Sequence, residues 1–233
     1  MTGTGSVRIM DVAAPTSLGP GRLVVDAAEN PSAVLWLGHG ASGGIGATDL
    51  AVLAAELPGQ GITVARYEQP WRVAGRRVGP RPAALDIAWR ETAPLVEQIA
   101  GGLPVVVGGR SAGARVACRT AASVDAVAVV CLAFPLHPPG RPEKSRLSEL
   151  LTPDVPVLVL QGERDTFGTA ATLAAEVGAA VGAAEVGTRR GIRVIAVPGA
   201  DHGMKVLASS PLNARAVAEL LTSSVAGFIR EVT

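Results

Sequence analysis

The chain has little of what nucleic-acid binding or membrane insertion requires. Only 3% of its 233 residues are aromatic, which is too few for a surface that stacks bases. Its formal net charge of +1 gives no electrostatic basis for binding nucleic acid or an anionic membrane. No apolar run reaches the length of a membrane span. We therefore expect no nucleic-acid partner and no association with a membrane.

Cysteine is equally scarce. Cys118 and Cys131 are the only two, and their spacing fits neither metal ligands nor a disulfide framework. We interpret them as buried thiols in a reducing compartment. The first residues also lack the basic start and apolar core of a signal peptide. The sequence thus predicts a cytoplasmic protein without a metal or a cofactor.

What the chain does contain is a regular alternation of strand and helix patterns. Apolar runs of strand length occur at 33–37, 62–66, 104–108, 126–132, 155–160 and 192–197. Helical patterns follow them at 48–57, 83–99, 114–122, 169–183 and 212–230, with a short one at 145–151. Residues 6–10 and 22–26 are expected to form an antiparallel hairpin at a sheet edge.

This alternation predicts an α/β fold with a doubly wound, mostly parallel sheet of about seven or eight strands and helices on both faces. No linker or repeat interrupts the pattern, so we expect one domain over residues 1–233, with its core at about 20–230. The longest connections, 67–82 and 135–153, are too short to build a separate cap domain.

The run from Val105 to Gly113 carries the strongest chemical signal. An apolar strand ends there, and Gly109-Arg110-Ser111-Ala112-Gly113 fits the G-x-S-x-G pattern of a nucleophile elbow, with a helical pattern after it. Side chains at 109 and 113 would crowd so sharp a turn, and glycine tolerates its backbone angles. The pattern predicts that the hydroxyl of Ser111 is exposed on a strand-to-helix turn.

Two later strand ends supply partners for this serine. Asp165 follows the strand at 155–160, and His202 follows the strand at 192–197. Serine needs a base to take its proton, and the base needs a carboxylate to hold its tautomer. The carboxyl ends of parallel strands meet at one sheet edge. We therefore predict a catalytic triad of Ser111, Asp165 and His202.

Other residues compete for two of these roles. The chain has three histidines, and His137, in the proline-rich connection, is the main rival to His202 as the base. Glu163 is the next choice for the acid. Asp154 precedes its strand and so faces the other end of the sheet, and Asp201 adjoins His202, so their side chains diverge.

The loop Gly38-His39-Gly40-Ala41 is expected to help stabilise an oxyanion. In this arrangement one donor is the backbone N–H after the serine, here that of Ala112, and we assign the second to Ala41. His39 is expected to hold the loop by hydrogen bonding. The stretch 38–43 also matches the G-x-G-x-x-G dinucleotide pattern, which leaves an NAD-binding domain as a minor alternative.

Residues that border these loops are candidates for contacting a substrate. Trp71 and Phe134 are expected to form an apolar wall, and Arg110 is expected either to make a structural salt bridge or to point to the substrate. The arginines of the loop at 67–82 either attract an acidic acyl group or are simply solvated; they are Arg72, Arg76, Arg77 and Arg81. The predicted substrate contacts are His39, Gly40, Trp71, Arg110, Phe134 and His137.

The segments LGHGASGG, YEQPWRVAGRR, GGRSAGAR, FPLHPPGRPEK and LQGERDTFG resemble the α/β-hydrolase superfamily. More narrowly, they resemble small dienelactone-hydrolase-like members related to testis-expressed protein 30, over about residues 20–228. The resemblance implies the hydrolase fold and the triad of Ser111, Asp165 and His202. Dienelactone hydrolases have a cysteine nucleophile where this chain has Ser111, so dienelactone is not the expected substrate.

The sequence therefore predicts a serine hydrolase that cleaves a small ester, thioester or amide through an acyl-enzyme on Ser111. Its expected partner is a small ester-like molecule, and a monomer and a homodimer both remain open. The alternative is a hydrolase-fold scaffold that binds a protein partner or a small molecule without turnover, because relatives of this group include a subunit of a chromatin acetyltransferase complex.

Overall fold

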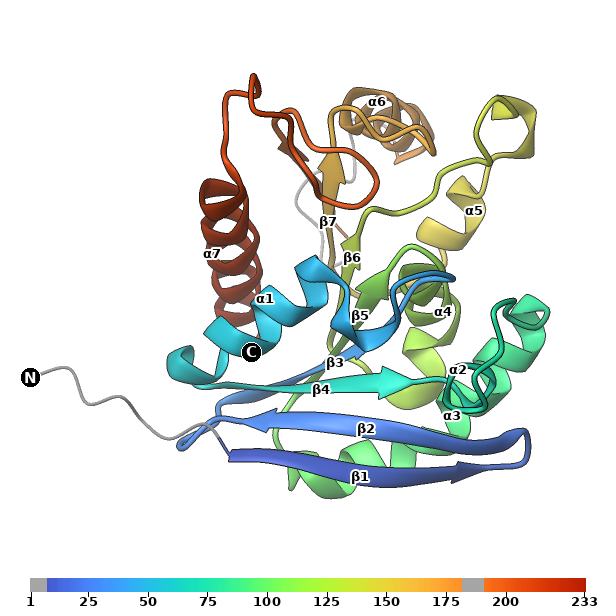
Figure 1. Ribbon diagram of the computed structural model, residues 1–233, viewed down its shortest axis with the longest axis vertical. Helices are drawn as coiled ribbons and strands as arrows, with labels where there is room; N and C mark the ends of the chain where they lie inside the picture. The colour runs from blue at the N-terminus through green and yellow to red at the C-terminus, as the bar shows by residue number, and fades with distance from the viewer. Residues whose placement is uncertain (1–7, 182–190) are drawn as a thin grey trace, which may run out of the picture.

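The computed structural model describes residues 8–181 and 191–233, which contain an eight-stranded sheet in the order β1-β2-β4-β3-β5-β6-β7-β8 (Figure 1). The four strands that come first in the chain are β1 (Arg8–Thr16), β2 (Gly19–Ala27), β3 (Ala33–Gly38) and β4 (Ile62–Glu68). They are followed by β5 (Val105–Arg110), β6 (Ala128–Leu132), β7 (Val157–Gly162) and β8 (Ile192–Val197).

Strand direction matches the sequence-based expectation. From β4 through β3 to β8 every neighbouring pair is parallel. β1 and β2 form an antiparallel hairpin at the edge, and β2 is also antiparallel to β4. The hairpin is longer than predicted, since both of its strands have nine residues. β3, β6 and β7 are buried along their whole length, as the apolar runs that make up β3, β6 and the first four residues of β7 indicate.

Helices cover both faces of the sheet (Figure 1). One face carries α1 (Thr48–Glu56) and α7 (Ala214–Val232), which bury leucines, valines and Ile229 against the strands. The other carries α3 (Pro82–Ala100), α4 (Ala112–Thr120), α5 (Leu147–Leu150) and α6 (Ala170–Val181). The predicted end of α6, at 182–183, lies outside the described residues.

The second face contains an aromatic cluster that fixes the position of α3. The indoles of Trp36 on β3 and Trp89 on α3 stack with their ring centroids 3.8 Å apart, and Tyr67 packs edge-on to both. The Tyr67 hydroxyl donates to the carbonyl oxygen of Ala88 at 3.2 Å, and burial raises the pKa of this phenol to about 12. Tyr67 is thus a core residue, although the sequence places it at the start of a loop.

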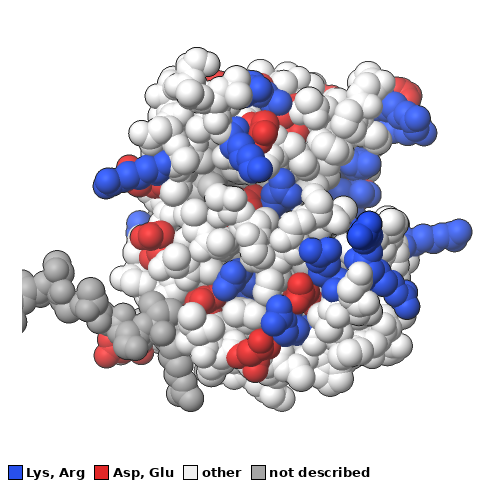
Figure 2. All heavy atoms as spheres, in the orientation of Figure 1, with Lys and Arg blue, Asp and Glu red and all other residues white. Residues whose placement is uncertain are grey.

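The connections after β4 and β6 stay short, as predicted. The loop after β4 contains one unpredicted helical turn, α2 (Pro70–Val73). In the described parts of the chain no separate cap domain covers the sheet edge, and no helix is both long and apolar enough to cross a membrane. Figure 2 shows acidic and basic side chains interspersed on the face in view, in keeping with the net charge of +1.

Candidate active site

The elbow at Ser111 has the strained geometry that its sequence pattern predicts. Ser111 lies between the end of β5 and the start of α4, and its φ of 53° is in the left-handed region. A Cβ at Gly113 would lie 2.3 Å from the carbonyl oxygen of Gly38, and one at Gly109 would lie 2.5 Å from the same atom. Both glycines are therefore required by the close approach of two backbones.

The structure brings Ser111, His202 and Asp165 into one chain of hydrogen bonds. Nε2 of His202 lies 3.0 Å from Oγ of Ser111, and Nδ1 lies 2.8 Å from Oδ2 of Asp165. An ionised carboxylate can only accept, so Nδ1 carries the proton and Nε2 is free to accept the serine proton. The phenyl ring of Phe167 packs against the imidazole, with centroids 4.2 Å apart.

Asp165 is fixed by donors that the sequence pattern does not single out. Its side chain is fully buried, and Oδ1 accepts the backbone N–H of Phe167 at 2.8 Å. Nε2 of Gln161, on β7, donates to Oδ2 at 3.0 Å. The same Gln161 amide also donates to the backbone oxygens of Phe134 and Gly168. A polar residue in a buried strand is the only sequence signal for Gln161.

The competing candidates lie elsewhere. The carboxylate of Glu163 accepts the backbone N–H of Gly199 at 2.9 Å, and that of Asp201 accepts the backbone N–H of Gly203 at 2.7 Å. His137 is half-buried, with Nδ1 3.1 Å from the carbonyl oxygen of its own neighbour Pro138. The structure does not bring any of the three into the hydrogen-bond chain of Ser111.

Arg110 does not point to a substrate site, so that part of its prediction is wrong. Its side chain is 10% exposed and forms an ion pair with the fully buried carboxylate of Asp49, with Nε 3.1 Å from Oδ2. Its Nη2 donates to the carbonyl oxygen of His202 at 2.7 Å. Burial raises the pKa of Asp49, and the charge of Arg110 opposes that shift. The salt-bridge alternative is therefore the one that the geometry supports.

The proposed oxyanion donors lie at the ends of two facing segments. Ala112 begins α4, and the first amides of an α-helix have no acceptor within the helix. Ala41 follows β3 in the loop opposite, and both residues line one cavity. Gly40 lies against the elbow, since a Cβ there would lie 3.1 Å from Nη1 of Arg110 and 3.4 Å from Cβ of Ser111.

His39 holds this loop through both of its ring nitrogens. The backbone N–H of Gln69 donates to Nε2 at 3.1 Å, so the ring proton is on Nδ1, which contacts the carbonyl oxygen of Gly40 at 2.7 Å. Burial lowers the pKa of His39 and keeps this tautomer neutral. The Gly40 carbonyl and the Ala41 N–H belong to one peptide group, so the imidazole orients that N–H.

A cavity of about 310 Å³ opens beside the two oxyanion candidates and is lined largely by apolar side chains. Trp71 forms part of its wall. Phe134 does not, and that prediction is wrong because the chain turns at Ala133, with a φ of 49°, and Phe134 is fully buried in the core. Arg76, Arg77 and Arg81 are exposed.

Comparison with a protein-family description decides the family. Residues 31–230 match the family described as alpha/beta hydrolase domain. The chain belongs to this alpha/beta hydrolase family. The matched range contains every residue of the hydrogen-bond chain at Ser111, both oxyanion candidates and the stretch 38–43 on which the NAD-binding alternative rested.

Solved structures share this alpha/beta hydrolase fold. A serine hydrolase without a lid from Xanthomonas campestris aligns with a TM-score of 0.71 at 18% identity, over 97% of this chain and 96% of that one. Dienelactone hydrolase from Anabaena variabilis gives 0.68 at 17%, over 93% and 96%. An esterase from Pyrobaculum calidifontis gives 0.63 at 20%, over 97% and 86%. A comparison with curated proteins gave no match.

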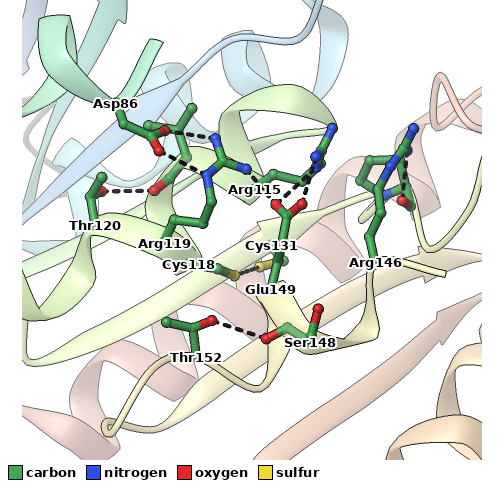
Figure 3. A network of polar contacts seen from close by, with 12 residues as sticks. Asp86, Arg115, Cys118, Arg119, Thr120, Cys131, Arg146, Ser148, Glu149 and Thr152 are labelled. Atoms are coloured by element: carbon green, nitrogen blue, oxygen red, sulfur yellow. Dashed lines mark hydrogen bonds and ion pairs between the residues drawn. The ribbon is translucent and has the colours of Figure 1, made fainter. Parts of the chain in front are cut away.

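An ionic network braces this hydrolase domain next to the cavity (Figure 3). Glu149 on α5 binds Arg115 on α4 through two hydrogen bonds of 2.6 and 3.0 Å, and it also binds Arg119. Arg119 in turn makes two hydrogen bonds to Asp86 on α3. The network ties three helices together around the cavity wall. Its members were not predicted: Arg115 ends the segment GGRSAGAR but had no assigned role, and Asp86, Arg119 and Glu149 lie outside the quoted segments.

The two cysteines lie below this network in the view of Figure 3. Cys118 on α4 and Cys131 on β6 are buried, with their sulfur atoms 3.5 Å apart, in keeping with the interpretation of buried thiols. The neighbouring Cys118 and burial together raise the pKa of the Cys131 thiol. Over the two described ranges no three His, Cys, Asp or Glu side chains gather in a way that would hold a metal ion.

Proposed function

We propose that this protein is a serine hydrolase that cleaves a small ester, thioester or amide through an acyl-enzyme on Ser111. The observation that carries the proposal is the unbroken hydrogen-bond chain from Oγ of Ser111 through His202 to a buried Asp165. A serine hydroxyl becomes nucleophilic when an adjacent base accepts its proton. Membership of the alpha/beta hydrolase family supports the same chemistry.

In the first half-reaction, His202 takes the proton of Ser111 as Oγ attacks the substrate carbonyl carbon. The negative charge that forms on the carbonyl oxygen is stabilised by the N–H groups of Ala41 and Ala112, helped by the positive end of the α4 dipole. His202 then gives its proton to the leaving alcohol, thiol or amine. The bond to the leaving group breaks, and the acyl group stays on Ser111.

In the second half-reaction, water takes the place of Ser111 as the nucleophile. His202 accepts a proton from the water molecule while the water oxygen attacks the acyl carbon. The tetrahedral intermediate collapses, His202 returns the proton to Oγ, and the carboxylic acid leaves. Asp165 stays ionised and stabilises the imidazolium in both halves. We also propose that the substrate is a small molecule. Within the family, we propose that the chain is most similar to dienelactone-hydrolase-like proteins related to testis-expressed protein 30.

Hydrolysis of a panel of p-nitrophenyl and thiophenyl esters tests the proposal. We expect turnover by the wild type, a loss of roughly 10⁶-fold in kcat for Ser111→Ala and His202→Gln, and about 10⁴-fold for Asp165→Asn. Ser145→Ala, a change at an exposed serine bound to Glu176, is the matched control and should keep full activity. Turnover that does not depend on Ser111 would contradict the assigned nucleophile, and no turnover at all would favour a scaffold without catalysis.

A further inference from the structure

A second cavity adjoins the one beside the oxyanion loop, and Trp71 lines both cavities. The inner cavity, about 310 Å³, reaches from Ala41 and Ala112 to Leu85. The outer cavity, about 350 Å³, lies toward the β1–β2 turn, where Leu18 forms part of its wall. Besides Trp71, the two share Gln69, Val78 and Pro80. Trp71 therefore stands at a partition between the two spaces, of which the inner one is largely apolar.

We propose that the inner cavity receives a short, uncharged aliphatic acyl group and that Trp71 is the wall that limits its length. This inference rests on the proposed hydrolysis at Ser111. Because Ala41 and Ala112, which carry the donors assigned to the oxyanion, line this cavity, we place the acyl chain of the ester in it. Trp71 is accordingly a residue that determines specificity.

The size of the inner cavity sets the chain length. Its volume is near the lower end of the roughly 300–1,000 Å³ that ligand pockets usually have. At the ~30 Å³ that a water-sized group takes in a liquid, it holds about ten such groups. The ester group and its leaving-group oxygen use part of that space. Acyl chains of about four to six carbons therefore fill it, and longer chains meet the indole.

The charge of the lining favours an uncharged acyl group. Arg115 is the charged residue that lines the inner cavity, and Nε and Nη2 of its guanidinium both donate to the carboxylate of Glu149. An acidic acyl group would have to compete with that carboxylate. The loop residues Arg77 and Arg81 line neither cavity, and Arg76 lines only the outer one. A hydrocarbon chain needs no partner of this kind.

Trp71 is held rigidly enough to act as a wall. It belongs to the short helix α2, and its side chain is 6% exposed. One neighbour is the His39 ring, 5.5 Å away between centroids. The backbone of Gly79 approaches the other edge so closely that a Cβ there would lie 3.3 Å from Cε2. Among the described residues its Nε1 has no acceptor, so phenylalanine can replace it without breaking a hydrogen bond.

The test compares kcat/KM for straight-chain p-nitrophenyl esters from two to twelve carbons in the wild type, Trp71→Ala and Trp71→Phe. In the wild type, kcat/KM should decline for acyl chains longer than about six carbons. Trp71→Phe should show the same dependence on chain length. Trp71→Ala joins the cavities and should raise the ratio of C10 to C4 rates by at least roughly tenfold, since a few blocked methylenes account for that much. An unchanged ratio in soluble Trp71→Ala protein would overturn the proposal.

Two further substitutions each change the lining of one cavity, one on either side of the Trp71 indole. Leu85 lines only the inner cavity, so Leu85→Phe should shift the optimum to shorter chains even if Trp71→Ala does not fold. Ala84 lines only the outer cavity. Ala84→Leu should leave the wild-type profile in place but cancel the gain in long-chain rates when combined with Trp71→Ala. A shift toward longer chains in Leu85→Phe would contradict the proposal.

A binding measurement separates this inference from the proposed function. In Ser111→Ala protein, methyl esters from C4 to C12 can be ranked by the shift in melting temperature that each causes. A maximum at short chains that moves to longer ones on adding Trp71→Ala supports the wall even if no ester is hydrolysed. Turnover with a profile that Trp71→Ala and Leu85→Phe leave unchanged refutes the wall and retains the hydrolase. A monomethyl succinate that binds as well as methyl butyrate refutes the uncharged class.

Discussion

The guanidinium of Arg110 donates a hydrogen bond of 2.7 Å to the carbonyl oxygen of His202, a residue 92 positions later in the chain. The residue that precedes the proposed nucleophile thus holds the loop of the proposed base. The ion pair to Asp49, whose side chain is fully buried, prevents the guanidinium from turning toward solvent. The position between glycine and serine in the elbow therefore has a structural role in this chain.

Removing Arg110 should affect stability and catalysis separately. Arg110→Met leaves the Asp49 carboxylate buried without its partner, which costs about 3–5 kcal/mol of unfolding free energy. Arg110→Met combined with Asp49→Leu removes both charges and should recover most of that loss in urea unfolding. The His202 carbonyl still lacks its donor, so kcat for ester hydrolysis should stay low in the double variant.

The matched control is Arg215→Met, which breaks an exposed ion pair to Glu219 and should change the unfolding free energy by less than ~1 kcal/mol. If the double variant of Arg110 and Asp49 regained full kcat together with its stability, Arg110 would have no part in positioning His202.

His39 should influence the rate through the peptide group that it orients. His39→Leu removes the donor to the Gly40 carbonyl, so the Ala41 N–H is no longer held toward the oxyanion. We expect kcat to fall toward the ~10²–10³-fold loss typical of a missing oxyanion donor, with little change in KM. Ser145→Ala, at an exposed serine bound to Glu176, is the control. Equal kcat in both variants would contradict the role of His39.

The buried imidazole of His39 also predicts a pH dependence of stability. Burial lowers its pKa from the ordinary 6.5, so between the folded pKa and about 6.5 the unfolded chain binds more protons than the folded one. His39 therefore contributes a loss of unfolding free energy as the pH falls through that window. Urea unfolding at pH 7.5 and pH 5.5 should show a smaller difference for His39→Leu than for the wild type.

Glu149 predicts a change at lower pH. Burial alone would raise its pKa, but the hydrogen bonds and charges of Arg115 and Arg119 outweigh it, so the pKa lies below the ordinary 4.5. The stabilisation is complete above about 4.5 and is lost as the pH falls through the folded pKa. Glu149→Gln should lower the unfolding free energy by about 1–3 kcal/mol at pH 7. If the difference in unfolding free energy between Glu149→Gln and the wild type stayed constant down to pH 3, it would contradict this account.

The sequence predicted the fold well because the strands of a parallel sheet carry their own signal. β3 and β6 are continuous apolar runs, β7 is apolar from Val157 to Leu160, and β8 was predicted with its exact bounds at 192–197. The hairpin was predicted too short, because residues such as Pro15 and Pro20 read as part of the turn although they pair in the edge strands. The single turn α2 is too short to leave a periodic pattern.

The sequence predicted the residues whose place in the site follows from their position in the chain. It did not predict the residues whose place depends on the direction in which the side chain points. Ser111, Asp165 and His202 each follow a strand, so parallel topology was enough to bring them to one edge. Arg110 and Phe134 also follow or end strands, but one turns to Asp49 and the other into the core at the bend of Ala133. Gln161 lies inside a strand, where only its contacts reveal its relation to Asp165.

The most direct test of the central claim is covalent labelling with a fluorophosphonate, followed by mapping of the adduct by mass spectrometry. Proposed catalysis at Ser111 predicts one adduct on that residue in the wild type, no labelling of Ser111→Ala, and much slower labelling of His202→Gln. Ser42→Ala, at an exposed serine in the neighbouring loop, should label like the wild type. Labelling of Ser111→Ala at the wild-type rate would contradict the account.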